Sequence, residues 1–137
     1  MNKGKISTLV LTIAVICLFW GMAGLAKAEP RSNPNTAIGE AIRLLEQKDY
    51  LAWYKNITPP EGLEHLTDKV INSIAQAYGQ HADDLLKVLK AIKNVKPKTT
   101  GQNKIIYKVP QNLEDIINAV ELNKINGLWY INFKYKK

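Results

Sequence analysis

The stretch IINAVELNKINGLWYINFKY, residues 116–135, decides the fold because it predicts a β-hairpin. Its centre, Asn126-Gly127, lies between two runs in which apolar and polar residues alternate. This dipeptide is the strongest short hairpin signal, since both central residues of the favoured two-residue turn need a positive φ. We therefore expect strands at about 116–125 and 128–135, joined by that turn.

A two-residue turn also fixes how the two strands pair. The expected facing pairs are Ile125–Leu128, Lys124–Trp129, Leu122–Ile131 and Val120–Phe133. One face of the hairpin then carries the apolar residues Val120, Leu122, Trp129, Ile131 and Phe133. The other face carries Glu121, Asn123, Tyr130, Asn132 and Lys134. A slip of one residue would mix the two faces, so the sequence favours this register.

Upstream of the hairpin, the apolar residues follow a helical period. Their spacing predicts helices at about 37–47, 61–78 and 81–94, with Thr36 as the N-cap of the first. Asp49 is expected to cap a further short helical segment that ends before Thr58-Pro59-Pro60. Alternation predicts another strand at about 105–109, and residues 99–103 are expected to form a turn or loop. Amphipathic helices are the available cover for an apolar sheet face, so the predicted class is α+β, with helices first and then a short antiparallel meander.

The N-terminus has the layout of a secretory signal peptide. Lys3 and Lys5 precede residues 6–26, which contain no charge, and the small-x-small tripeptide Ala26-Lys27-Ala28 follows. We expect cleavage after Ala28, then a flexible lead-in over residues 29–36 and a single domain over 37–137. The alternative is an uncleaved anchor, because 21 apolar residues are long enough to cross a bilayer. Both interpretations predict an exported domain, periplasmic or secreted.

Processing would change both the charge and the chemistry of the chain. The formal net charge is +7 in full, but residues 29–137 carry 16 basic against 12 acidic side chains. The only cysteine, Cys17, lies within the expected signal peptide, so the mature domain would have no disulfides and no thiol nucleophile.

A basic stretch without acids follows Leu85, with lysines at 87, 90, 93, 96, 98, 104 and 108. It could attract an anionic surface, but we favour a solvated helix face with weak or absent membrane binding, so that the protein would meet a membrane only through an uncleaved N-terminal segment. We expect no nucleic acid partner.

Five aromatic residues are the candidate pocket lining: Tyr50, Trp53, Tyr54, Tyr107 and Trp129. A sheet curved over helices could place them around a cavity for an apolar ligand. The alternative, which we favour, is that they form the core, because aromatic side chains dominate core burial.

No catalytic, cofactor or metal site is predicted. The two histidines, His65 and His81, are sixteen residues apart, and the sequence contains neither HExxH nor an Asp-rich calcium loop. Nucleophile elbows, phosphate loops and dinucleotide fingerprints are also absent from it. The sequence therefore favours a binding or interaction module, not an enzyme.

Three segments resemble small exported bacterial domains of the nuclear-transport-factor-2-like (cystatin-like α+β) superfamily. They are AIRLLEQKDYLAWYKNITPPEGLEHL (41–66), HADDLLKVLKAI (81–92) and the terminal INGLWY (125–130). The resemblance implies a cone-like fold, in which helices pack on a curved antiparallel sheet around a pocket. Some members of the superfamily are isomerases, dehydratases or cyclases that use a buried Asp or His, and those positions do not map onto this sequence.

The sequence therefore predicts an exported small binding module that takes an apolar small molecule or a protein partner, and it is compatible with a homodimer. One alternative is a small isomerase or hydro-lyase of the same superfamily. Another is an envelope-anchored accessory protein. An enzyme needs a buried ionisable group facing its cavity, whereas a binding module does not, and this difference would discriminate the first two.

Overall fold

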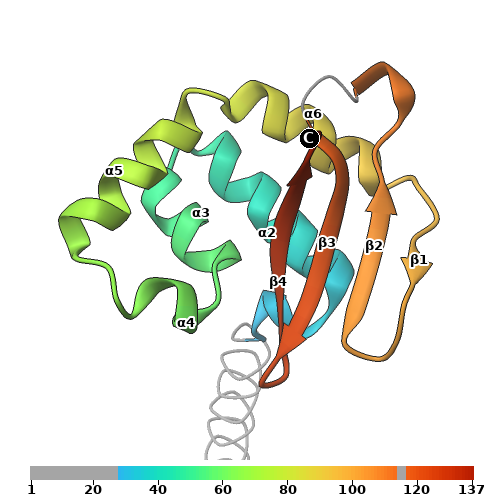
Figure 1. The fold of residues 1–137 in the computed structure, drawn as a ribbon, viewed down its shortest axis with the longest axis horizontal. Helices are drawn as coiled ribbons and strands as arrows, with labels where there is room; N and C mark the ends of the chain where they lie inside the picture. The colour runs from blue at the N-terminus through green and yellow to red at the C-terminus, as the bar shows by residue number, and fades with distance from the viewer. Residues whose placement is uncertain (1–27, 114–116) are drawn as a thin grey trace, which may run out of the picture.

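The chain is described by a computed structural model that covers residues 28–113 and 117–137. The predicted signal peptide, apart from Ala28, lies outside the described residues. In the described part, helices pack on a four-stranded antiparallel sheet of strand order β1-β2-β3-β4 (Figure 1). The α+β prediction is therefore confirmed.

The sheet consists of β1 (Lys98–Thr99), β2 (Lys104–Lys108), β3 (Ile117–Ile125) and β4 (Leu128–Tyr135). The β3–β4 hairpin has the predicted register, and all four predicted facing pairs are present. Asn126 and Gly127 both have a positive φ, of 51° and 81°, as a two-residue turn of this kind requires. The short strand β1 was not predicted: Lys98 and Thr99 pair with Ile106 and Ile105 of β2 instead of belonging to a loop.

The helical part begins with the 3-10 turn η1 (Pro30–Ser32) and helix α2 (Pro34–Glu46). The N-cap of α2 is Asn33, not Thr36, because Asn33 accepts a hydrogen bond from the Asn35 amide and Pro34 suits the first helical position. Residues 29–36, expected as a flexible lead-in, are thus largely helical. Arg31 pairs with Glu29 at 2.9 Å and lies 5.5 Å from the centre of the Tyr130 ring, so η1 packs on β4.

Helix α3 (Tyr50–Ile57) has the predicted N-cap, since Asp49 accepts a hydrogen bond from the Ala52 amide at 3.2 Å. The helix predicted over 61–78 is instead divided into α4 (Pro60–Leu63) and α5 (Asp68–Gly79). The division occurs because the Thr67 side chain accepts from the Val70 amide and starts a new helix. Helix α6 (Ala82–Ile92) agrees with prediction to within two residues at its C-terminal end.

The core lies between the helices and one face of the sheet. The predicted apolar face of the hairpin is confirmed, because all five of its residues are at most 6% exposed. Helices α2 and α6 supply most of the facing side chains: Ala37, Ile38, Ala41, Ile42, Leu44 and Leu45 from α2, and Leu85, Val88, Leu89 and Ile92 from α6. Helices α3, α4 and α5 extend beyond the β4 edge (Figure 1).

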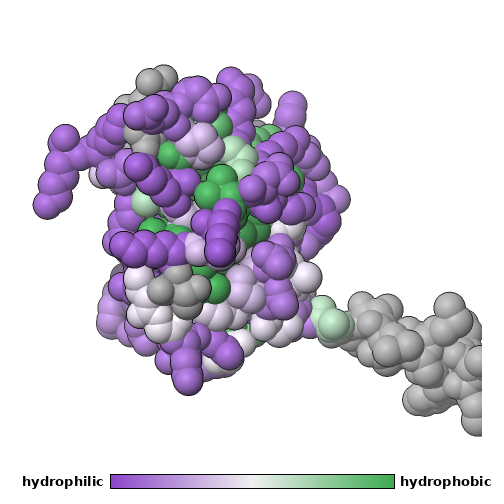
Figure 2. All heavy atoms as spheres, turned by 90° about the vertical axis from the view of Figure 1, so that its right-hand side faces the viewer, coloured by the Kyte–Doolittle hydropathy of each residue, from purple (hydrophilic) through white to green (hydrophobic). Residues whose placement is uncertain are grey.

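The opposite face of the hairpin is less exposed to solvent than its polar residues suggested. Tyr130 is buried there under Arg31. Glu121 is also buried, and its carboxylate lies 3.6 Å from Lys104 Nζ and 3.8 Å from Lys134 Nζ. Seen from the side of β1 and β2, the surface is mostly hydrophilic around a small apolar area (Figure 2). None of the helices in residues 28–113 and 117–137 has the length and hydropathy that crossing a bilayer requires.

Candidate ligand pocket

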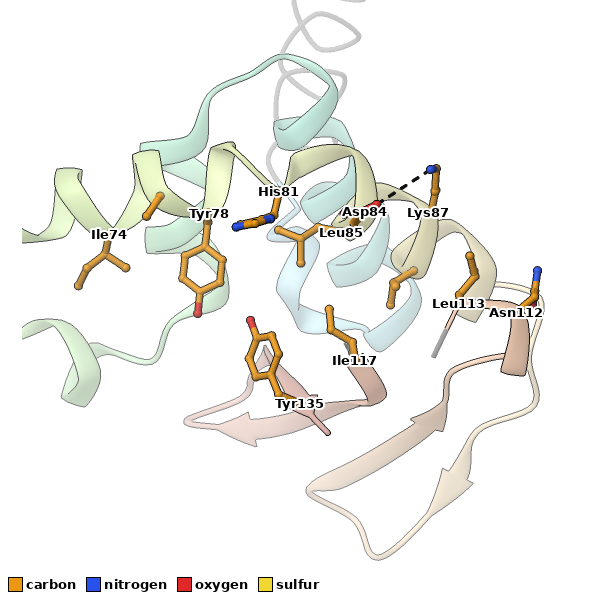
Figure 3. A pocket seen from close by; sticks show the side chains of 12 residues that line it. Ile74, Tyr78, His81, Asp84, Leu85, Lys87, Asn112, Leu113, Ile117 and Tyr135 are labelled. Carbon is orange, nitrogen blue, oxygen red and sulfur yellow. Dashed lines mark ion pairs between the residues drawn. The ribbon is translucent and has the colours of Figure 1, made fainter. Parts of the chain in front are cut away.

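A pocket of about 690 Å³ lies between α5, α6 and the adjacent ends of β3 and β4 (Figure 3). This volume is within the usual range of small-molecule sites, roughly 300–1,000 Å³. The residues around it are Ile74, Ala77, Tyr78, His81, Asp84, Leu85, Lys87, Val88, Asn112, Leu113, Ile117 and Tyr135. Most of the wall is apolar, with polar groups in a few places, as is typical of ligand sites.

Helical periodicity brings the wall together. On α5, Ile74, Ala77 and Tyr78 are spaced i, i+3 and i+4, so they share one face. From the N-cap of α6 onward, His81, Asp84, Leu85 and Val88 continue the same spacing. The other wall comes from the 3-10 turn η2 (Gln111–Leu113), the first residue of β3 and the last residue of β4.

Besides Asn112 and the charged or titratable residues, two tyrosines, Tyr78 and Tyr135, contribute hydroxyl groups to the described lining of the pocket. Their hydroxyls point toward one another, one from α5 and the other from β4 (Figure 3). Although Tyr135 is 48% exposed, its partial burial and the neighbouring Tyr78 raise the pKa of Tyr135 to about 12. The shift disfavours the phenolate of Tyr135 still further than in an ordinary tyrosine.

The ring of Tyr78 is held from behind by two aromatic side chains of α3. Its centre lies 5.4 Å from that of Trp53, edge to face, and 5.8 Å from that of Tyr54, in a stacked arrangement. Both separations are in the favourable range for aromatic pairs. The core thus fixes the direction in which the Tyr78 hydroxyl points.

The charged groups of the pocket are at its solvent side. Lys87 Nζ lies 4.0 Å from Asp84 Oδ1, and both side chains are 66% exposed. His81 is also exposed. Further along α6, Lys90 pairs at 2.8 Å with Glu46 of α2. With Lys104 beside Glu121, three lysines of the basic stretch have acidic partners, which weakens the field it could present to an anionic surface.

None of the five predicted lining residues borders this pocket. Trp53, Tyr107 and Trp129 are buried in the core, as the alternative interpretation had it. Tyr50 packs against Gly79, and Tyr54 stacks on Tyr78. These two support the pocket wall from behind without reaching the cavity.

The sequence pattern of the pocket residues did not distinguish a pocket from an ordinary buried surface. The residues of α5 and α6 that line it continue a helical apolar stripe, which by itself predicts burial against the sheet. Tyr135, at the end of the last strand, has no motif around it. Its role depends on where α5 lies relative to β4, which is a long-range property of the fold.

The histidines do not form a shared site. His65 is 85% exposed between α4 and α5 and lies 3.2 Å from Glu64, whereas His81 is at the rim of the pocket. Among residues 28–113 and 117–137, no three His, Cys, Asp or Glu side chains are grouped so that they could hold a metal ion.

Comparison with known proteins finds no matching family, no matching curated protein and no matching solved structure.

Proposed function

We propose that the chain is an exported binding module, not an enzyme, and that its pocket takes a small, predominantly apolar molecule. The observation that carries this proposal is the pocket itself, with Ile74, Leu85 and Ile117 in its wall. Withdrawing an apolar ligand from water against such side chains is favourable in proportion to the area buried, by about 25 cal/mol per Å².

The positions of the ionisable groups favour binding over catalysis. Asp84 and Lys87 are largely exposed to solvent, and each lies near the opposite charge of the other. A general acid or base usually owes its perturbed pKa to burial beside a partner. Among the described lining residues, neither a carboxylate nor the histidine has such an environment.

The remaining parts of the proposal concern class and location. We propose that the chain belongs to the nuclear-transport-factor-2-like superfamily and has its cone-like fold; the helical layer on one face of an antiparallel meander, with a pocket beside it, supports this proposal. We also propose cleavage after Ala28 and a periplasmic or secreted mature protein. The intact mass of the exported protein tests this, because retention of residues 1–28 in membranes would favour the anchored alternative.

Binding is tested by filling the pocket from one side. Ala77 is exposed on α5 and borders the cavity, so Ala77→Phe places a ring in the pocket without altering the core. Gln76→Phe, one residue earlier on the same helix and outside the lining, is the matched control. We expect Ala77→Phe to weaken binding of diphenylhexatriene, a hydrocarbon that fluoresces in apolar surroundings, by about tenfold or more, and Gln76→Phe to change it by less than about twofold.

Wild type and variants are compared in the same processed form. Any binding of the probe to a retained N-terminal segment is then the same in all of them and does not affect the comparison. Saturable binding that both variants leave unchanged would place the probe elsewhere. That result would contradict the proposed pocket function.

A further inference from the structure

We propose that Tyr78 and Tyr135 are the polar anchor of the pocket, and that the pocket selects an uncharged molecule with an apolar body and one hydrogen-bond-accepting oxygen, such as a ketone. This inference rests on the proposed function and specifies its ligand class. Its basis is the placement of two phenol groups in an otherwise mainly apolar cavity, together with the balance of charge around them.

The two hydroxyls converge from different elements, α5 and β4, inside the wall that Ile74, Leu85 and Ile117 form (Figure 3). A phenol offers one O–H donor and can also accept. When two phenols face one another, one can donate to the other, and the second proton remains free for a ligand oxygen. A ketone oxygen accepts that proton and has a further lone pair for the other hydroxyl.

The anchor is held ready before a ligand arrives. Trp53 and Tyr54 pack against the ring of Tyr78 and orient it. The hydroxyl of Tyr135 is a neutral donor at neutral pH, as any phenol with a pKa of about 10 or higher is. Donors that are already oriented lose little freedom on binding, which favours affinity. Because both hydroxyls are neutral donors, they suit a neutral acceptor as well as a charged one.

Charge decides between these two acceptors. Among the lining residues that the structure describes, Asp84 and Lys87 are the carboxylate and the ammonium group, and their opposite charges lie 4.0 Å apart. An anionic ligand would be attracted by Lys87 but repelled by Asp84, and the reverse holds for a cation. An ion without a net partner loses hydration on entering an apolar site, so an uncharged ligand is favoured.

Three probes with the same apolar body test the inference: naphthalene, acetylnaphthalene and naphthoate. They differ only in carrying no head group, a ketone or a carboxylate. In displacement of diphenylhexatriene, we expect acetylnaphthalene to bind wild type most tightly. Tyr78→Phe and Tyr135→Phe should each weaken acetylnaphthalene by about three- to tenfold, the range for loss of a neutral hydrogen bond, and change naphthalene by less than about twofold.

Tyr130→Phe is the matched control, because Tyr130 lies on the opposite face of the sheet under Arg31. It should leave the binding of all three probes unchanged. Tyr135 is 48% exposed, so Tyr135→Phe should fold even if Tyr78→Phe disturbs the aromatic packing, and it then carries the test alone.

The outcomes separate this inference from the proposed function. If naphthalene binds in a way that Ala77→Phe abolishes, but the Tyr→Phe variants weaken all probes equally or none, the anchor is wrong and the pocket function stands. Tightest binding of naphthoate would overturn the preference for an uncharged ligand. If none of the probes binds in an Ala77-dependent way, the proposed function itself fails.

Discussion

The β3–β4 hairpin and helix α5 both carry regularly spaced apolar residues, alternating in the hairpin and at helical spacing in α5, but these residues are buried to very different extents. The five apolar residues on the inner face of the hairpin are at most 6% exposed. On α5, Ile71 and Ala75 are buried, yet Val70 is 42% exposed and Ala77 is open to solvent. The inner face of the hairpin between Val120 and Phe133 is buried in the core, whereas α5, like Tyr135 at the end of β4, has apolar surface that the core does not cover.

Helix α5 has in effect two apolar stripes. Ile71, Ala75 and Gly79, spaced by four residues, face the neighbouring helix α3, where Gly79 meets the ring of Tyr50. Ile74, Ala77 and Tyr78 face the pocket. The comparison teaches that apolar surface left over after the core is complete marks the candidate binding site in this fold, because burial of such surface is favourable wherever a partner can supply it.

The largest expected effect comes from truncating a hairpin residue. Trp129→Ala should lower the free energy of unfolding by about 3–5 kcal/mol, because a 6% exposed indole leaves a cavity in the core. Val70→Ala on α5 should change it by less than about 0.5 kcal/mol, since the residue is 42% exposed. Urea denaturation of both variants measures the contrast, and similar losses would contradict the division between the two regions.

The next effect tests how tightly the inner stripe of α5 packs. A methyl group at position 79 would overlap the ring of Tyr50, so Gly79→Ala should destabilise the domain by about 1–3 kcal/mol. Gly39→Ala in α2 is the matched control, because nothing lies within 4 Å of its added Cβ. In that helix, alanine should stabilise by up to about 1 kcal/mol, so the two Gly→Ala changes should have opposite signs. Thermal unfolding of both variants checks this.

The smallest effect concerns the outer face of the hairpin and depends on pH. A hydrogen bond from Asn123, with Lys134 and Lys104 nearby, holds the pKa of Glu121 below its usual value. A lowered folded-state pKa means that the ionised carboxylate stabilises the fold above the unfolded-state pKa of about 4.3. That contribution is lost as the pH falls through the folded-state pKa.

Glu121→Gln should therefore lower the free energy of unfolding at pH 7 by up to about 1 kcal/mol, as is usual for partly solvated ion pairs. The difference from wild type should shrink in acid. Urea denaturation at neutral and acidic pH measures both values. A difference that stays constant across this range would show that the effect of the substitution is unrelated to ionisation.

The sequence predicted those features of the fold that residues close together in the chain determine. The hairpin register follows from Asn126-Gly127 and from alternation, and both signals lie within 20 residues. The cap at Asp49 is equally local. The break between α4 and α5 also had a local signal, the capping residue Thr67, but the apolar period continued through it and suggested one helix.

The pocket could not be predicted in the same way. Trp53 is adjacent to Tyr54 in sequence, yet Trp53 is fully buried and Tyr54 only partly. Trp53 packs against both Tyr78 of α5 and Phe133 of β4, whereas Tyr54 stacks on Tyr78. Which aromatic residue ends in the core and which near a cavity depends on contacts between distant segments. Tyr78 and Tyr135, 57 positions apart, illustrate this directly.

The burial of Trp53 has a consequence for observing motion in this protein. Its indole Nε1 is buried with no hydrogen-bond partner among the described residues. Exchange of that proton with deuterium is therefore slowed only by exclusion of solvent, without a hydrogen bond that must break first. Since Trp53 packs between Tyr78 and Phe133, its exchange rate reports how often α3, α5 and β4 separate, on the timescale of local opening. The exchange rate of this indole proton therefore measures how often the wall behind the pocket opens.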